Sequence, residues 1–160
     1  MPRVHHVKRA RKAIKSAGIK VGDSYYWWKF RYGGKRVSKT RPRASQLTMS
    51  DKLSRAYAAA EALEDIVVDD DTTLDDLKSL VDDIASDVGD IAQEYRDNRE
   101  NMPESLQDGD VGQQMEENAD SLESWQSDIE QCLDDVDEDD EDWRDSAITA
   151  IEDQAGACPL

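Results

Sequence analysis

The most regular pattern in the chain is a stripe of apolar residues between positions 74 and 95, spaced alternately three and four residues apart. The spacing holds for three heptads, and most positions off the stripe are Asp, Glu, Ser or Lys. Such a stripe predicts a helix over about 73–101 that packs through a coiled-coil seam. The seam residues are Leu74, Leu77, Val81, Ile84, Val88, Ile91 and Tyr95.

A second stripe of the same kind follows over about 112–136. The first helix should end near Met102-Pro103, and the loop with Gly109 and Gly112 allows the chain to reverse. Two such helices joined by a short loop most simply form an antiparallel hairpin. The seam residues of the second helix are Met115, Ala119, Leu122, Trp125, Ile129, Leu133 and Val136.

Shorter helices are predicted on either side of this hairpin. One over about 50–68 is capped by Thr48 or Ser50, and Asp69-Asp70-Asp71 interrupts it before a new cap at Thr72 or Thr73. Another covers about 142–154, and residues 156–160 are expected to be a frayed tail. The apolar faces of these two helices comprise Leu53, Tyr57, Ala60, Leu63 and Val67 in the first and Trp143, Ala147 and Ile151 in the second.

The N-terminal region has a different pattern. Residues 5–16 can form a short basic helix that ends at Gly18. Residues 25–32 hold six aromatic side chains in eight positions, which favours a strand. Gly33-Gly34 predicts a two-residue hairpin turn with positive φ angles, and 35–40 returns as the partner strand. Residues 41–47, around Pro42, read as an extended linker.

Strand alternation divides the aromatic residues between two faces. Tyr26, Trp28, Phe30 and Tyr32 share one face, which we expect to be the core of the small sheet. The other face carries Tyr25, Trp27, Lys29 and Arg31.

Together these patterns predict a mainly α fold. An antiparallel acidic helical hairpin or coiled coil follows a small basic module made of an N-terminal helix and a β-hairpin. The expected boundaries are 1–47 for the basic module, 48–155 for the acidic helical region and 156–160 for the tail.

The charge distribution sharpens this division. Residues 1–55 hold sixteen Lys and Arg against two acids, whereas residues 56–160 hold four against thirty-five. The two parts are therefore about +14 and −31, within a chain whose net charge is −17. Such asymmetry indicates a polyanion-binding end joined to an acidic segment.

The basic module combines the two features that nucleic-acid binders need. Cationic side chains neutralise phosphates, and aromatic faces stack on bases. The alternative is that the aromatic residues only form the core of a small sheet. The candidate nucleic-acid-binding residues are Lys8, Arg9, Arg11, Lys12, Tyr25, Trp27, Lys29, Arg31, Lys35, Arg36, Lys39, Arg41 and Arg43.

The acidic helices allow three interpretations. Their carboxylates could be a solvated coiled-coil face, a partner that neutralises the basic end of the same chain, or a mimic of the charge of DNA. The sequence leaves open whether the helices form a homodimer or dock on another protein.

Catalytic and cofactor chemistry is not visible in the sequence, so we expect no enzyme, no metal site and no cofactor. There is no glycine-rich phosphate loop or nucleophile elbow. A calcium loop starting at Asp134 would need glycine and glutamate where Asp139 and Asp145 stand. Cys132 and Cys158 read as free thiols of a reducing compartment. No apolar run is long enough to span a bilayer, so we expect no membrane association.

Two resemblances add to this interpretation. The order of aromatic strand, glycine turn and Gly34-Lys35-Arg36-x-Ser38 is similar to the arm-site-binding module of tyrosine recombinases, over the hairpin alone. The chain as a whole resembles a family of small uncharacterised proteins of tailed bacteriophages and prophages. The segments that carry the second resemblance are Val7–Lys12, Gly22–Phe30, Ser38–Thr48 and Asp97–Gln107, and the helix with Trp125 also fits. That resemblance implies expression in the cytoplasm of an infected bacterium and supplies no activity.

The expected function is therefore that of a non-enzymatic phage accessory protein. Its basic module would contact nucleic acid, and its acidic helices would self-associate or dock on a host or phage protein. One alternative is an acidic DNA mimic that inhibits a host nuclease or defence complex. Another is a coiled-coil component of the virion or of its assembly.

Overall fold

A computed structural model describes all of residues 1–160 and divides them into two compact units, Met1–Ser54 and Arg55–Leu160. The chain is mainly helical and has one small three-stranded antiparallel sheet, which confirms the predicted fold class. The division lies in the first turn of helix α1 (Asp51–Glu64), a little further along the chain than the expected boundary at residue 47. None of the helices combines the length and apolarity needed to cross a membrane.

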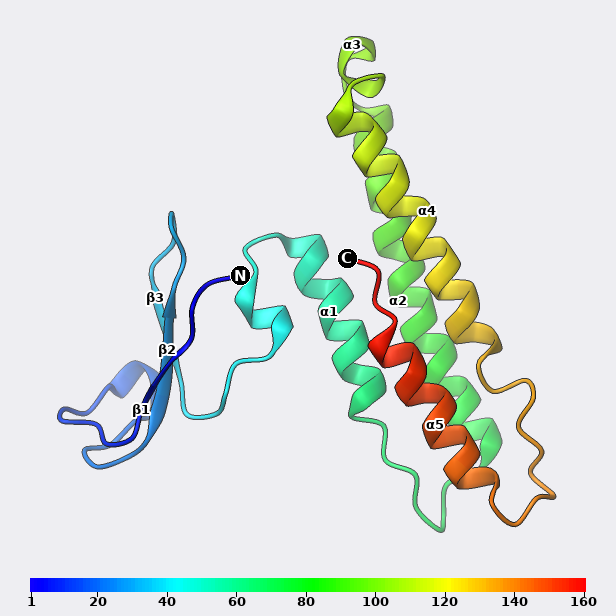
Figure 1. The fold of residues 1–160 in the computed structure, drawn as a ribbon, viewed down its shortest axis with the longest axis horizontal. Helices are drawn as coiled ribbons and strands as arrows, with labels where there is room; N and C mark the ends of the chain where they lie inside the picture. The colour runs from blue at the N-terminus through cyan, green and yellow to red at the C-terminus, as the bar shows by residue number, and fades with distance from the viewer. The chain divides into compact units, whose positions relative to one another are not determined.

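The long helical hairpin is the main element of the second unit. α2 (Leu74–Glu100) and α4 (Asp110–Gln131) run alongside each other, with the short helix α3 (Glu104–Gln107) at the tip (Figure 1). α2 begins with a capping box, in which the Asp76 N–H donates to Thr73 Oγ1 over 3.2 Å and the Thr73 N–H donates to Asp76 Oδ2 over 3.3 Å.

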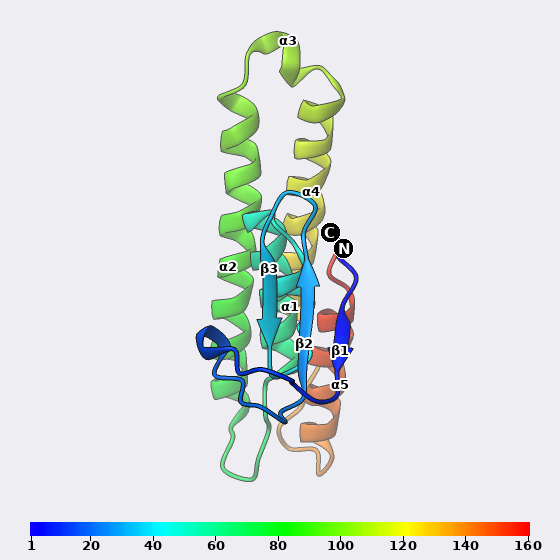
Figure 2. The ribbon, with the colours of Figure 1, turned by 90° about the vertical axis from the view of Figure 1, so that its left-hand side faces the viewer.

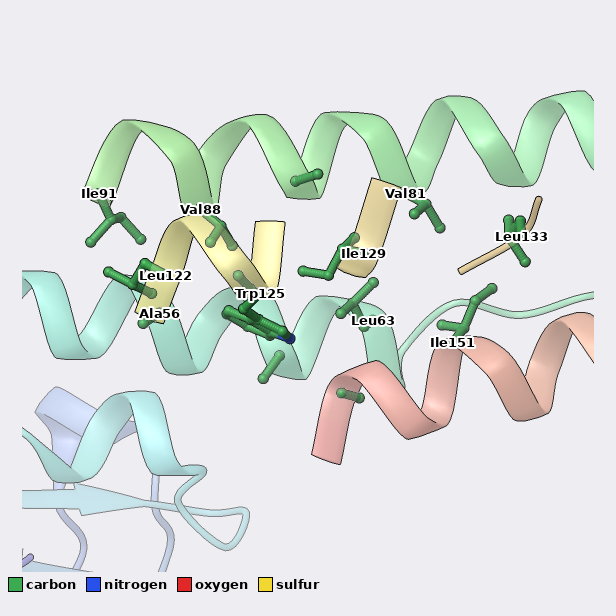
Figure 3. Packing of buried hydrophobic residues seen from close by; sticks show 14 of the residues in the cluster. Ala56, Leu63, Val81, Val88, Ile91, Leu122, Trp125, Ile129, Leu133 and Ile151 are labelled. Carbon is green, nitrogen blue, oxygen red and sulfur yellow. The ribbon is translucent and has the colours of Figure 1, made fainter. Parts of the chain in front are cut away.

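The core of this unit involves four helices, because α1 and α5 (Trp143–Gly156) pack on the hairpin as well. Figure 3 shows side chains of α1, α2, α4 and α5 pointing toward one another around Trp125. Ile84, Met115 and Val136 are only partly buried. The other predicted seam residues are buried: Leu74, Leu77, Val81, Val88, Ile91, Tyr95, Ala119, Leu122, Trp125, Ile129 and Leu133.

The predicted face of α5, Trp143, Ala147 and Ile151, is buried, whereas α1 differs from its expected range and face. α1 ends at Glu64 because the β-branched run Ile66-Val67-Val68 and the three aspartates after it disfavour helix. Val67, placed on the apolar face by the sequence pattern, is 78% exposed. Ala60 and Leu63 are buried as predicted, Leu53 and Tyr57 are half-buried, and Ala56 and Ala59 complete the buried face.

Polar contacts fasten α5 and the loops around it. The Trp125 indole N–H donates to the Gln154 carbonyl over 3.0 Å and so joins α4 to α5. Arg144 donates to the carbonyls of Asp69 and Asp70 over 3.1 Å each, which holds the loop between α1 and α2. The tail expected to be frayed packs against the core through Cys158 and Leu160.

The first unit is built on a sheet of β1 (His5–Val7), β2 (Tyr25–Lys29) and β3 (Lys35–Ser38), with β2 in the middle (Figure 2). The predicted basic helix over 5–16 is wrong. Residues 5–7 pair with β2 instead, since an exposed aromatic strand gains a second hydrogen-bonded partner and cross-strand stacking. Helical structure in this stretch is limited to a 3₁₀ turn (η1, Lys15–Ala17), which Gly18 ends with φ of 63°.

The predicted two-residue turn at Gly33-Gly34 is also wrong. The last pair of the hairpin is Lys29 with Lys35, so five residues form the loop, and neither glycine has a positive φ. The reason is that Phe30 leaves the strand and is buried, at 7% exposure, beneath the loop. A Cβ on Gly33 would lie 3.1 Å from the Cβ of Phe30. After β3 the expected linker has an extended part followed by a 3₁₀ turn (η2, Ala44–Leu47).

Candidate nucleic-acid interface

The basic loop after β1, residues 8–24, has a defined shape because backbone hydrogen bonds close it at two places along its length. The Ala10 N–H donates to the Asp23 carbonyl over 2.8 Å, and the Gly22 N–H donates to the Ala10 carbonyl over 2.9 Å. Further out, Ile14 and Ile19 exchange bonds of 2.9 and 3.1 Å. The loop is therefore a folded element and not a free cationic arm.

Anchoring of this loop decides where its cations lie. Ala10 is 2% exposed and contributes to the core of the unit, whereas Arg9 and Arg11 on either side of it are exposed. Burial of Ala10 therefore anchors the loop in the core, while Arg9 and Arg11 on either side of it remain in solvent.

Register places the aromatic residues of β2 on two different faces. Trp27 lies opposite His5 on β1 and Val37 on β3, and Tyr25 lies opposite Val7 on the same face. Trp28, on the other face, is 3% exposed and belongs to the core. Tyr32, expected on that core face, is instead 85% exposed in the hairpin loop.

Trp27 is not a free stacking platform. The His5 imidazole stacks on its indole with ring centroids 4.1 Å apart and planes 9° apart. Lys35 Nζ lies 4.3 Å from the centroid of the same indole. Because β1 and β3 flank β2 on opposite sides, His5 and Lys35 approach the indole from opposite sides. A base could stack on Trp27 only by displacing one of them.

The candidate cations share one property, which is that all eleven are exposed. They fall into three stretches: the loop after β1, the hairpin, and the segment after β3. Lys39 forms an ion pair with Asp23, Nζ to Oδ2 3.8 Å. By stretch they are Lys8, Arg9, Arg11 and Lys12; Lys29, Arg31, Lys35, Arg36 and Lys39; and Arg41 and Arg43.

Two of these cations are brought directly together. Lys29 and Lys35 form a cross-strand pair, and like charges in such a position disfavour the sheet. The placement of Lys35 Nζ over Trp27 offsets part of that cost through a cation–π contact. A bound phosphate would relieve the remaining repulsion.

The sequence pattern gave no role to His5 and His6. His6 stacks on Tyr26 with ring centroids 4.6 Å apart, on the opposite face from the His5–Trp27 pair. Two adjacent histidines before Val7 are compatible with a strand, which places one ring on each face. Because a helix was predicted over residues 5–16, this alternation was not used. Since the two imidazoles lie on opposite faces of β1, they do not form a joint metal site, and no cluster of three or more His, Cys, Asp or Glu in the chain could hold a metal ion.

The second unit, Arg55–Leu160 (the helical unit), presents a surface of the opposite sign. Two arginines of α2 pair across the hairpin: Arg96 Nη2 lies 3.0 Å from Asp120 Oδ1 and 2.6 Å from Glu123 Oε2, and Arg99 Nη2 lies 3.2 Å from Glu116 Oε2. The seam is apolar throughout, so the many remaining carboxylates of the hairpin lie outside it. No protein-family model, curated protein or solved structure matches this chain.

Proposed function

We propose that this protein is a non-enzymatic nucleic-acid-binding protein whose first unit, Met1–Ser54 (the sheet unit), makes the contact. One observation carries the proposal: the sheet unit holds fifteen Lys and Arg against Asp23 and Asp51, a net charge of +13, and its candidate cations are all exposed. A structural hairpin does not need this excess charge. The repulsion that it creates is repaid when phosphates bind and counterions are released.

In this proposal the acidic helical unit self-associates or docks on a host or phage protein. Its charges and those of the sheet unit are screened from one another beyond about 8 Å at physiological salt. The resemblance to tailed-phage proteins supports a role as an accessory protein in the cytoplasm of an infected bacterium.

A salt-titrated binding assay with the full chain tests the proposal. Labelled single-stranded and duplex oligonucleotides are titrated with protein, and fluorescence anisotropy gives the affinity at each salt concentration. Each phosphate contact should contribute about −0.9 to the slope of log affinity against log salt for duplex DNA. Absence of binding to DNA and RNA of either form at low salt would refute the proposal.

A pair of single substitutions provides the matched control. Arg11→Gln removes an exposed cation of the sheet unit and should reduce the steepness of the salt dependence by about 1. Lys78→Gln removes a cation from α2 in the acidic unit and should leave the slope unchanged. Equal effects of the two substitutions would show that net charge, and not the sheet unit, determines binding.

The charge of the helical hairpin favours a second candidate function, inhibition by DNA mimicry. Exposed carboxylates on α2 such as Asp82, Asp83 and Asp90 lie on a regular, firmly packed helix, as phosphate-like display requires. The test is competition with duplex DNA for a basic DNA-binding nuclease. Mimicry predicts inhibition that the triple substitution to Asn at these positions weakens, while the same change at Asp137, Asp139 and Asp140, in the loop before α5, has less effect.

A further inference from the structure

A hollow of about 300 Å³ lies in the sheet unit, beside the first residues of β2. Val7, Ile14 and the Tyr25 ring form its apolar part, and three cations of the basic loop complete it. No acidic residue lines it. Its size is at the lower end for small-ligand sites, and it combines an apolar wall with a few polar groups, as such sites usually do.

Tyr25 differs from the other aromatic residues of β2 in that no other ring or cation lies on it. Trp27, on the same face, is stacked on His5 and lies against Lys35, Tyr26 is stacked on His6, and Trp28 is buried. Tyr25 is half-buried and its ring has no stacking partner. Among the aromatic residues of this strand it is the one on which a planar ligand can stack without displacing another ring or a cation.

The backbone that carries the cations of the hollow is fixed before any ligand binds. Arg9, Arg11 and Lys12 are exposed and have no ion-pair partner. The loop that carries them is closed by the Ala10 bonds to Asp23 and Gly22 and by the pairing of Ile14 with Ile19. Such preorganisation lowers the entropic cost of binding an anion.

We propose that this hollow binds one nucleotide of a single-stranded nucleic acid, with the base stacked on Tyr25 and the flanking phosphates held by Arg9, Arg11 and Lys12. The inference rests on the proposed function and names the subsite that would make the protein prefer single-stranded to duplex nucleic acid. A base in a duplex is paired and stacked, so it cannot enter a hollow beside the sheet, whereas an unpaired base can. The sheet unit should therefore prefer single strands to duplex.

The test uses the full chain and two forms of one sequence, a labelled single strand and its duplex. Tyr25→Leu keeps an apolar side chain but removes the ring, and it should weaken binding of the single strand by at least about five-fold, the lower end of the range for one stacked base. Affinity for the duplex and the salt slope should not change. Tyr25→Phe keeps the ring and should restore single-strand affinity, and Tyr32→Leu, which removes an 85% exposed ring outside the hollow, is the matched control.

The outcomes separate the subsite from the proposed function. The subsite is supported if Tyr25→Leu weakens the affinity for the single strand alone and Tyr25→Phe restores it. Unchanged single-strand affinity in Tyr25→Leu, or equal loss with Tyr32→Leu, overturns the subsite while nucleic-acid binding stands. Equal weakening for single strand and duplex also overturns it, because stacking predicts a difference between them. Absence of binding by the unsubstituted chain refutes both.

Discussion

The imidazole of His5 lies parallel to the indole of Trp27, with ring centroids 4.1 Å apart. This contact joins the first strand of the chain to the central strand and replaces the helix that the basic residues around it favoured. It also covers a ring that would otherwise be the obvious place for a base to stack.

Replacing His5 by Ala should loosen the sheet unit. Stacked aromatic pairs contribute about 0.5–1.5 kcal/mol beyond the area that they bury. The free energy of opening that protects the amides of β1 and β2 should therefore fall by about this amount, and their exchange should become faster. His5→Phe restores a stacking ring and should recover most of the protection. Amide protection in His5→Ala equal to that of the unsubstituted chain would mean that the stack does not stabilise β1.

Leu122 tests the four-helix core. It is fully buried in α4, so Leu122→Ala should lower the free energy of unfolding by about 2–5 kcal/mol. Leu106→Ala, at the tip of the hairpin, removes the same atoms from a side chain that is 51% exposed and should cost much less. Urea denaturation followed by circular dichroism at a helical band measures both. Similar costs would contradict the packing described for α4.

Gly112 tests the reversal between α3 and α4. A Cβ at this position would lie 2.1 Å from the carbonyl oxygen of Gln107, so Gly112→Ala forces the backbone to move. We expect a loss of about 1–3 kcal/mol in the free energy of unfolding. Gly156→Ala at the end of α5 meets nothing within 4 Å and should be neutral or stabilising by up to about 1 kcal/mol. A neutral Gly112→Ala would show that the turn is looser than the close approach implies.

Cys132 predicts a dependence of stability on alkaline pH. Burial, and then the negative charge of Asp134, raise the pKa of its thiol from 9.0 to about 11. The folded chain therefore holds this proton more tightly than the unfolded chain. The stability that follows is fully present below pH 9 and is lost as the pH rises through about 11.

The measurement is the difference in unfolding free energy between the unsubstituted chain and Cys132→Ala across this pH range. The difference should decrease as the pH rises, because only the unsubstituted chain loses the contribution of the thiol. Other titrating groups are common to both proteins and cancel. A difference that stays constant from about pH 8 to about pH 11 would show that the thiol titrates alike in folded and unfolded chains.

The elements that the sequence predicted well are those fixed by local periodicity. The stripe from Leu74 to Tyr95 fits a helix and not a strand, and Thr73 followed by Asp76 marks where that helix begins. Packing of α1 and α5 on the hairpin was harder to foresee, because it depends on small residues such as Ala56 and Ala59 that carry little hydrophobic signal.

In the sheet unit the errors have a shared cause, which is that long-range contacts override local preference. Residues 5–7 become a strand only because β2 is available, and the turn lengthens only because Phe30 is buried. The candidate cations could be identified from the sequence alone. The sequence could not show which aromatic ring lacks a partner, because this depends on His5 and Lys35 lying on Trp27 and not on Tyr25.

Mapping of nucleic-acid contacts by NMR tests the central claim most directly. The full chain, labelled with ¹⁵N, is titrated with a short single-stranded oligonucleotide, and changes in amide shifts are followed residue by residue. Binding by the sheet unit predicts that the changes concentrate in residues 8–43, above all around Arg9, Arg11 and Tyr25, and that α2 and α4 are unaffected. Changes confined to the helical unit, or no changes at low salt, would contradict it.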